Sequence, residues 1–343
     1  MRAIKAAAVQ AAPVFMNLDA SIDKAAALID EAAKRGAELI AFPETWLPGF
    51  PWFIYLGTPA DALAFFPRYH ANSMALDSPH MLRLQGIVKR AGVTVVMGFS
   101  ERAMNSRYMA QAIIDPDGKL LLTRRKLKPT HIERTVFGEG DGSDLVVVDA
   151  PFGRLGALNC WEHIQPLMKM AMYAQHEEIH VAAWPSLSIY RDIAYALGPE
   201  VNNAASMMYA VEGGCFVLAP CAVISQEMFD LLCDTPHKAH LLNPRTDGPG
   251  GGFAVIYGPD GRALCETLPE NQEGILYADL DPEMITLAKA TADPVGHYAR
   301  ADALRLVVNR TKRIVMTETN CPAPGDEEIK TPPAASAPDQ IDA

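Results

Sequence analysis

Hydrophobic positions along the chain recur with two different periods, and the order of these periods predicts an α/β fold. Residues 3–10 alternate weakly, as a strand does. Asn17 can cap a helix that runs to about residue 35, because apolar side chains then recur every three or four positions and Gly36 can end it. Further helices are expected at 81–91, 163–175 and 202–211, and strands at 38–42, 93–98, 108–114, 120–123, 145–148, 152–158, 179–183 and 215–219.

Two turn signals place hairpins among these elements. Residues 115–118 read Asp-Pro-Asp-Gly, and residues 259–261 read Pro-Asp-Gly between apolar segments at 252–257 and 262–266. Helices, strands and hairpins in this order predict mixed sheet layers covered by helices. We expect one domain over residues 1–310 and a C-terminal extension over 311–343. The part after residue 321 contains five prolines and is expected to be flexible, with disorder from about residue 322.

Composition narrows the class of protein. The net charge of −11 and the lack of a basic stripe disfavour a nucleic-acid partner. No apolar run approaches the roughly 20 residues of a membrane span, and the apolar start of the chain is broken at Gln10, so we reject a signal peptide. The six cysteines form no CxxC pair and therefore indicate reduced thiols. A cytoplasmic protein without a membrane or nucleic-acid partner is expected.

Cys160 is the first candidate for catalysis. It follows the apolar, glycine-rich segment 152–158 and precedes a helical pattern, so it is expected at the junction between a strand and a helix. A rigid backbone holds a thiol there, and a nearby helix N-terminus favours its thiolate. The alternative is an inert cysteine in the core.

Glu44 is the second candidate. It follows a buried strand and Pro43, and precedes an aromatic and proline-rich segment at 45–53. A carboxylate in such surroundings has a raised pKa and suits general-base catalysis. Alternatively, Glu44 is a solvated acid at the end of a strand, and the aromatic segment packs in the core instead of lining a substrate pocket.

A basic run at residues 124–134 supplies the third group. Lys126 and Lys128 would point the same way in an extended strand, so spacing does not choose between them. A lysine beside a thiolate would stabilise that thiolate and negative charge on a substrate, and Glu133 could orient the lysine. The alternative is a solvated basic strand end. The glycine-rich residues 138–142 lack the context of a phosphate loop, so a nucleotide role is set aside.

Several histidines are candidate partners of the thiol or candidate metal ligands. His131, His163 and His297 could each assist a cysteine nucleophile. His176 and His180 have helical spacing, but no HExxH motif or Cys/His cluster accompanies them. No metal site is expected.

Together these segments resemble the nitrilase branch of the carbon–nitrogen hydrolase superfamily over about residues 1–310. The matching segments are 42–51 (FPETWLPGFP), 125–130 (RKLKPT) with Glu133 and Arg134, 138–142 (GEGDG), and 159–163 (NCWEH) with Pro166. The resemblance implies a four-layer α-β-β-α sandwich. It also implies catalytic residues at Glu44, Lys126 rather than Lys128, and Cys160, a supporting Glu133, and no cofactor. Family members form homodimers, and some of these grow into spiral filaments.

The resemblance implies hydrolysis of a nitrile with water to a carboxylic acid and ammonia, through a thioimidate and a thioester. Lys126 and the Trp161 N–H would stabilise charge on the substrate. The segment 44–49 resembles enzymes active on arylacetonitriles. A cyanide-hydrating enzyme, an aliphatic amidase and an inert assembly protein remain alternatives. The candidates for the substrate pocket are Trp46, Trp52, Phe53, His131, Trp161, Trp184 and Pro185.

The segment 296–302 (GHYARAD) resembles the family's C-terminal Gly-His-Tyr motif, which suggests supporting roles for His297 and, beside Cys160, for His163. Ala301 stands where the family commonly has proline. We expect this departure to loosen a local turn without changing the chemistry.

Overall fold

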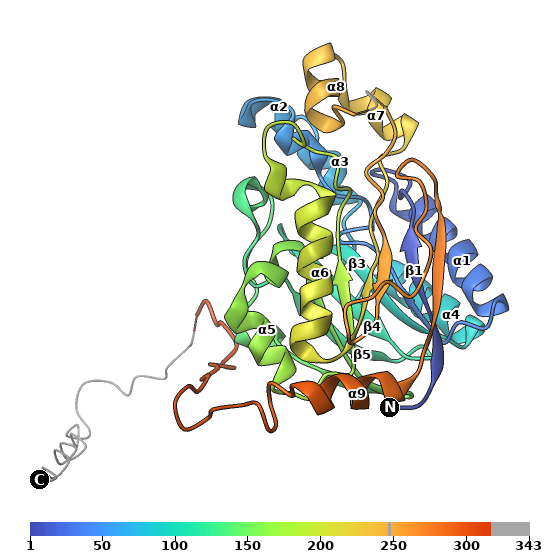
Figure 1. Ribbon diagram of the computed structural model, residues 1–343. Coiled ribbons are helices and arrows are strands. Elements are labelled where there is room, and N and C mark those ends of the chain that lie inside the picture. The colour runs from blue at the N-terminus through green and yellow to red at the C-terminus, as the bar shows by residue number, and fades with distance from the viewer. Residues whose placement is uncertain (246–247, 317–343) are drawn as a thin grey trace, which may run out of the picture. The chain divides into compact units, whose positions relative to one another are not determined.

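Two mixed sheets lie between two pairs of helices in the part of the chain from Met1 to Thr311 (Figure 1). The computed structural model describes residues 1–245 and 248–316. The chain divides into a unit over Met1–Thr311 and a unit over Lys312–Ala343. Residues 312–316 of the second unit form no helix or strand, and the expected disorder from about residue 322 lies outside the described residues.

Each sheet has three parallel strands in its middle and antiparallel strands at its edges. The first sheet contains, in spatial order, β11 (Gly274–Leu280), β1 (Ile4–Gln10), β2 (Leu39–Ala41), β3 (Thr94–Ala103), β4 (Ser106–Ile114) and β5 (Leu120–Arg125). The second contains β10 (Val255–Tyr257), β9 (Phe216–Ala219), β8 (Ile179–Ala183), β7 (Gly153–Asn159) and β6 (Val148–Ala150).

Helices cover the outer face of each sheet. α1 (Leu18–Lys34) and α4 (Pro79–Ala91) lie on the first sheet, and α5 (Pro166–Tyr173) and α6 (Pro199–Gly213) on the second (Figure 1). The Asn17 side chain accepts the Ala20 N–H and caps α1, as predicted. The order of layers is therefore α-β-β-α, which confirms the predicted fold.

Strand β1 shows why its sequence alternates only weakly. Ala6 and Ala8 point to the core between the sheets, whereas Ala7 and Val9 point to the core under α1 and α4. All four side chains are buried, because both faces of the strand are covered. The strand therefore carries apolar residues at every position from 6 to 9.

The remaining helices lie at the two ends of the sandwich. Four short helices, α2 (Pro59–Leu63), α3 (Phe66–Ala71), α7 (Gln226–Leu232) and α8 (Pro236–Leu242), gather near the carboxyl ends of the parallel strands, and α9 (Pro282–Thr291) lies at the other end (Figure 1). An aromatic cluster joins the first group to the 3-10 helix Trp52–Tyr55. Phe53, for example, stacks on Phe65 at 5.0 Å between ring centroids.

Three sequence expectations were wrong in detail. The turn at 259–261 closes only a short hairpin, with one antiparallel bridge between Tyr257 and Ala263, and residues 262–266 form no strand, so the regular partner of β10 is β9. The expected strand at 145–148 is Val148–Ala150. The helix expected from residue 163 begins at Pro166, because a 3-10 helix at Cys160–Ile164 precedes it.

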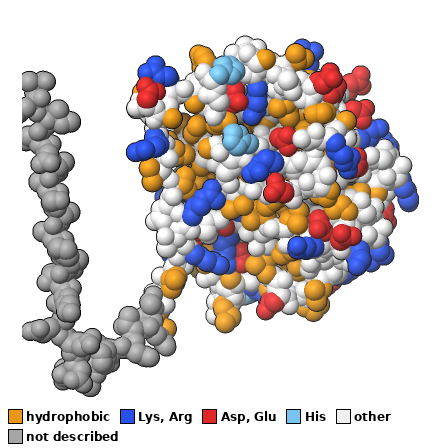
Figure 2. All heavy atoms as spheres, turned by 90° about the horizontal axis from the view of Figure 1, so that it is seen from below, with side chains coloured by type: hydrophobic (Ala, Val, Ile, Leu, Met, Phe, Trp, Pro, Cys, Tyr) orange, Lys and Arg blue, Asp and Glu red, His pale blue; other side chains and the backbone are white. Residues whose placement is uncertain are grey.

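One face of the molecule carries charged side chains of both signs. Figure 2 shows the face that lies at the bottom of Figure 1, where basic and acidic side chains are intermixed and separated by apolar ones. This face therefore presents no continuous basic surface. Among the described residues, no helix has both the length and the apolar character needed to cross a membrane.

Candidate active site

Three side chains meet where strands from both sheets end. Glu44 follows β2, Lys126 is the first residue after β5, and Cys160 is the first residue after β7. The Glu44 N–H donates to the Trp184 carbonyl just beyond β8 at 3.2 Å, which joins the two sheets at this point. The carboxyl ends of parallel strands are where α/β folds place their sites.

The four residues expected at the site form one buried cluster. Lys126 Nζ donates to Glu44 Oε1 at 2.9 Å and to Glu133 Oε2 at 2.8 Å. One oxygen of each carboxylate and the Cys160 sulfur all lie within 4.8 Å of one another. Lys128, by contrast, is exposed and pairs with Glu139. The structure therefore brings Lys126 rather than Lys128 to the thiol.

Burial determines the electrostatics of this cluster. It raises the pKa of Glu44 to about 8, against the opposing charge of Lys126, and the charge of Glu133 adds to the rise. It also raises the pKa of the Cys160 thiol well above its usual value, together with the charge of Glu44. Lys126 keeps a raised pKa, because the two carboxylates outweigh the effect of its burial. A carboxylate with a pKa near 8 is a stronger base than an exposed one.

The backbone is strained in all three segments of the candidate site. The φ angles are +50° at Thr45, +48° at His131 and +47° at Cys160. Residues other than glycine rarely adopt such positive values. In addition, a Cβ on Gly98 of β3 would lie 2.0 Å from the Pro43 carbonyl oxygen, so only glycine lets the Glu44 segment pass this close. The fold fixes the positions of these groups at a local cost.

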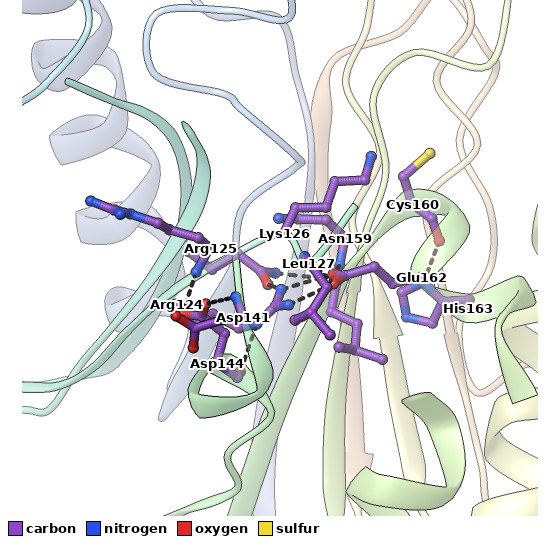
Figure 3. A network of polar contacts seen from close by, with 12 residues as sticks. Arg124, Arg125, Lys126, Leu127, Asp141, Asp144, Asn159, Cys160, Glu162 and His163 are labelled. Carbon is purple, nitrogen blue, oxygen red and sulfur yellow. Dashed lines mark hydrogen bonds and ion pairs between the residues drawn. The ribbon is translucent and has the colours of Figure 1, made fainter. Parts of the chain in front are cut away.

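A second ion pair holds two of the segments together (Figure 3). Glu162 and Arg124 are buried and form a bidentate ion pair, in which Arg124 Nη2 donates to Glu162 Oε1 at 2.7 Å and Nη1 donates to Oε2 at 2.9 Å. The same carboxylate accepts the Leu127 N–H at 2.9 Å and the Asn159 N–H at 2.8 Å. Burial alone would raise the pKa of Glu162, but Arg124 and these N–H groups lower it. Glu162 therefore fixes the neighbours of both Lys126 and Cys160.

A cavity of about 40 Å³ opens onto Cys160. Of the predicted wall residues, Trp52, Trp161 and Pro185 line it. His131 instead lines a neighbouring hollow of about 340 Å³, and Thr130 and Trp161 belong to the walls of both.

The other three predicted wall residues are buried away from this cavity. Trp46 donates to the Ala11 carbonyl, Trp184 donates to Ser206, and Phe53 belongs to the aromatic cluster. None of the three lines the cavity among the described residues. Trp46, Trp184 and Phe53 therefore pack in the core of the protein.

The histidines lie in different surroundings. His163 Nδ1 is 2.6 Å from the carbonyl oxygen of Cys160, so this side chain touches the backbone of Cys160. His297 is exposed in the turn after α9. It lines no cavity together with Cys160 among the described residues. The nearby Arg300 and Asp302, which flank Ala301, form an exposed ion pair at 2.8 Å.

Sequence reasoning missed several residues of the site. Tyr55 lines the cavity, and Asn202 anchors the Trp161 indole through a hydrogen bond of 3.0 Å. Tyr55 lies two residues after the aromatic segment 45–53 that signalled a pocket, so this proximity could have suggested it. Arg124 and Glu162 carried a weaker signal, since each lies two residues from a candidate catalytic residue. No local pattern marks Asn202, which comes from α6.

The two carboxylates and the thiol are a plausible donor set for a metal ion, but their geometry does not suit one. Lys126 Nζ lies within 2.9 Å of both carboxylates, in the place where a cation would bind. Its positive charge already compensates the two acids. The cluster is therefore better suited to proton transfer and nucleophilic attack than to metal binding.

Comparisons with known proteins agree with this arrangement. Residues 5–290 match the carbon-nitrogen hydrolase family. The chain is 56% identical over 306 residues to a nitrilase of Pseudomonas syringae pv. syringae, which covers 89% of this chain and 90% of the relative. It is 50% identical over 307 residues to an aliphatic nitrilase of Rhodococcus rhodochrous (89% and 82%) and 47% identical over 329 residues to an arylacetone-specific nitrilase of Alcaligenes faecalis (96% and 91%).

A solved structure shares the fold at low sequence identity. The carbon-nitrogen hydrolase from Helicobacter pylori G27 superimposes with a TM-score of 0.67 at 18% identity, over 88% of this chain and 97% of that chain. With the family match and the close relatives, this shows that the chain belongs to the carbon–nitrogen hydrolase family, within its nitrilase branch.

Proposed function

We propose that this protein is a nitrilase that hydrolyses an arylaliphatic nitrile to its carboxylic acid and ammonia. The observation that carries the proposal is a cavity with aromatic walls that opens onto Cys160, directly beside Glu44, Lys126 and Glu133. The thiol supplies a nucleophile, the carboxylate a base, and the lysine a positive charge.

The first half of the reaction forms a covalent bond. Glu44 Oε2 has no hydrogen-bond partner among the described residues, so it is available to take the thiol proton of Cys160. The sulfur then attacks the nitrile carbon and forms a thioimidate. Lys126 and the Trp161 N–H stabilise the charge that develops on the nitrogen. Glu133 holds Lys126 in place through its ion pair.

The second half releases both products. Glu44 activates a water that adds to the thioimidate and forms a tetrahedral intermediate. Loss of ammonia leaves a thioester, which a second water hydrolyses to the acid. Loss of the thiolate from the tetrahedral intermediate would release an amide instead. These steps use three side chains, one backbone N–H group and two water molecules, and they need no cofactor.

The preference for an arylaliphatic nitrile rests on the walls of the cavity. Phe50, Trp52, Tyr55 and Trp161 supply aromatic surface, and Leu187 and Ile189 supply aliphatic surface. Such walls favour an apolar group next to the nitrile. The names of the relatives include both an aliphatic and an arylacetone-specific nitrilase.

Product analysis tests this proposal. The purified protein is incubated with phenylacetonitrile, phenylacetamide, butyronitrile and cyanide, and ammonia, acid and amide are measured. We expect acid and ammonia from phenylacetonitrile and little turnover of the amide. Turnover of the amide alone would identify an amidase, preference for cyanide a cyanide-hydrating enzyme, and inactivity on all four an inert assembly protein.

The pH dependence of the reaction follows from the raised pKa of Glu44. The ionised carboxylate is the base, and its pKa of about 8 means that this form increases as the pH rises through 8. We therefore expect kcat/KM to rise over this range instead of levelling off near pH 6, as it would for an ordinary carboxylate. Initial rates between pH 5.5 and 9.5 measure this, and a flat profile between pH 6 and 9 would contradict it.

We also propose that the protein forms homodimers, which can extend into spiral filaments, across the outer faces of α5 and α6. Leu167, Met208 and Val211 on these helices are exposed by 70%, 42% and 43%. Exposed apolar side chains on adjacent helices favour contact with a second copy. Light scattering of the purified chain would give its mass, and a monomer at micromolar concentration would refute the proposal.

Domain limits and location in the cell complete the proposal. Residues 1–310 are proposed as the catalytic domain and residues 311–343 as an extension. All five cysteines of the described residues are free thiols. This supports a reducing cytoplasm as the location.

A further inference from the structure

A chain of four buried side chains leads from the backbone of Cys160 into the layer of α5 and α6. Its members, called the histidine chain below, are His163, His180, Glu177 and Tyr209. The distances are 2.6 Å from the Cys160 oxygen to His163 Nδ1 and 2.9 Å from His163 Nε2 to His180 Nε2. They are 2.7 Å from His180 Nδ1 to Glu177 Oε1 and 2.7 Å from Glu177 Oε2 to the Tyr209 hydroxyl. The mechanism above uses none of these groups.

The hydrogen bonds of this chain can point in only one direction if both histidines are neutral. A carbonyl oxygen only accepts, so His163 must carry its proton on Nδ1 and accept at Nε2. His180 must then donate from Nε2, which leaves its Nδ1 as an acceptor. Glu177 must donate to that nitrogen, so it is a carboxylic acid. The Tyr209 hydroxyl donates to its other oxygen.

The surroundings of Glu177 favour this uncharged form. Burial raises the pKa of Glu177 to about 8, although the hydrogen bond from Tyr209 lowers it. Burial also lowers the pKa of His180 well below its usual value, the charge of Arg124 adds to this, and Glu162 opposes it. Gly156 of β7 leaves the space that the carboxyl group fills, since a Cβ there would lie 1.8 Å from Glu177 Oε1.

The histidine chain contacts the Cys160 carbonyl. This carbonyl belongs to the same peptide group as the Trp161 N–H, the proposed charge-stabilising donor. In a trans peptide the C=O and the following N–H point in opposite directions. His163 holds the Cys160 carbonyl on one side, so the Trp161 N–H faces the other side, toward the Cys160 sulfur. Its hydrogen bond there lowers the pKa of the thiol, against the larger effect of burial.

We propose that the histidine chain orients and polarises the Cys160–Trp161 peptide, so that the Trp161 N–H stabilises charge on the substrate, with Glu177 acting as a neutral hydrogen-bond donor. Each bond of a connected chain strengthens the next one. A role in proton delivery to solvent does not fit, because the chain ends at the fully buried Tyr209. The inference rests on the proposed nitrile hydrolysis, and its residues are positioning residues.

Two substitutions of Glu177 separate this idea from a role in packing. In Glu177→Gln the amide can donate to His180 Nδ1 and accept from Tyr209, as the acid does, so kcat is expected to stay within about threefold of the wild type. Glu177→Leu breaks the chain. We expect kcat to fall about 10-fold with KM unchanged. This loss is smaller than the roughly 10²- to 10³-fold loss on deleting such a donor outright, because the Trp161 N–H itself remains.

Two further comparisons distinguish a loss of peptide positioning from a loss of folded protein. His163→Asn keeps an N–H for the Cys160 carbonyl, whereas His163→Leu does not, so the asparagine variant should retain more activity. Tyr173→Phe is the matched control, because its hydroxyl lies 3.4 Å from the Tyr209 carbonyl, outside the chain. This variant should keep its kcat.

Nitrogen NMR of the ¹⁵N-histidine-labelled wild type tests the direction of the chain without any turnover. Near pH 7 we expect two neutral rings, with the proton on Nδ1 in His163 and on Nε2 in His180, assigned by the signals lost in His163→Asn. An imidazolium at His180, a Glu177→Gln variant as slow as Glu177→Leu, or full activity in Glu177→Leu would overturn the proposal. A wild type inactive on nitriles would refute the proposed function alone, since the NMR result would still stand.

Discussion

Replacing Cys160 with alanine is expected to abolish hydrolysis, with a loss in kcat of about 10⁴-fold or more. No other nucleophile lies in the cluster among the described residues, because Glu44 and Glu133 are both paired with Lys126. Without sulfur, neither the thioimidate nor the thioester can form. Ammonia release measures the loss, and intact-protein mass spectrometry with the substrate should find no adduct.

A matched thiol controls for side effects of the substitution. Cys265 is half-buried and contacts the Ile256 N–H, outside the cluster. Cys265→Ala should therefore retain near-normal turnover. Glu44→Gln should lose activity as severely as Cys160→Ala, since an amide cannot take the thiol proton. If Cys160→Ala kept more than about one hundredth of the wild-type rate, the nucleophile would be misassigned.

The elements that sequence predicted well have local signals. The helix α1 has a cap at Asn17, a regular apolar face and Gly36 after its end. The strand β11, by contrast, was not predicted, and it pairs with β1 across more than 260 residues of sequence. Pairing over such a distance depends on tertiary packing, which no local pattern encodes.

The same limit applies within the site. Alternation could not choose between Lys126 and Lys128, because residues two positions apart point the same way in a strand. In the structure β5 ends at Arg125, before either lysine. Resemblance to the family supplied Lys126, and the structure places it between Glu44 and Glu133. The cavity walls were harder to predict, because an aromatic residue such as Trp46 suits a core as well as a pocket.

Replacing Glu162 with glutamine is expected to lower the free energy of unfolding by about 3–5 kcal/mol and to remove most activity. Glu162 accepts four hydrogen bonds, and an amide group would turn an NH₂ toward two of these donors. The buried charge of Arg124 would then lack its partner. The folded pKa of Glu162 is lowered, so its contribution is present above the unfolded value of 4.5 and is lost as the pH falls through the folded value.

Thermal unfolding at neutral pH and at a fixed scan rate, together with nitrile turnover, measures both effects. Glu38→Gln is the control, because its ion pair with Arg2 is exposed and contributes little to stability. A double variant, Arg124→Met with Glu162→Met, separates the two roles. Removing both charges should restore part of the stability. Activity should stay low, because the N–H groups of Leu127 and Asn159 still lack the acceptor that positions Lys126 and Cys160. Recovery of activity together with stability would mean that Glu162 stabilises the fold without positioning the catalytic groups.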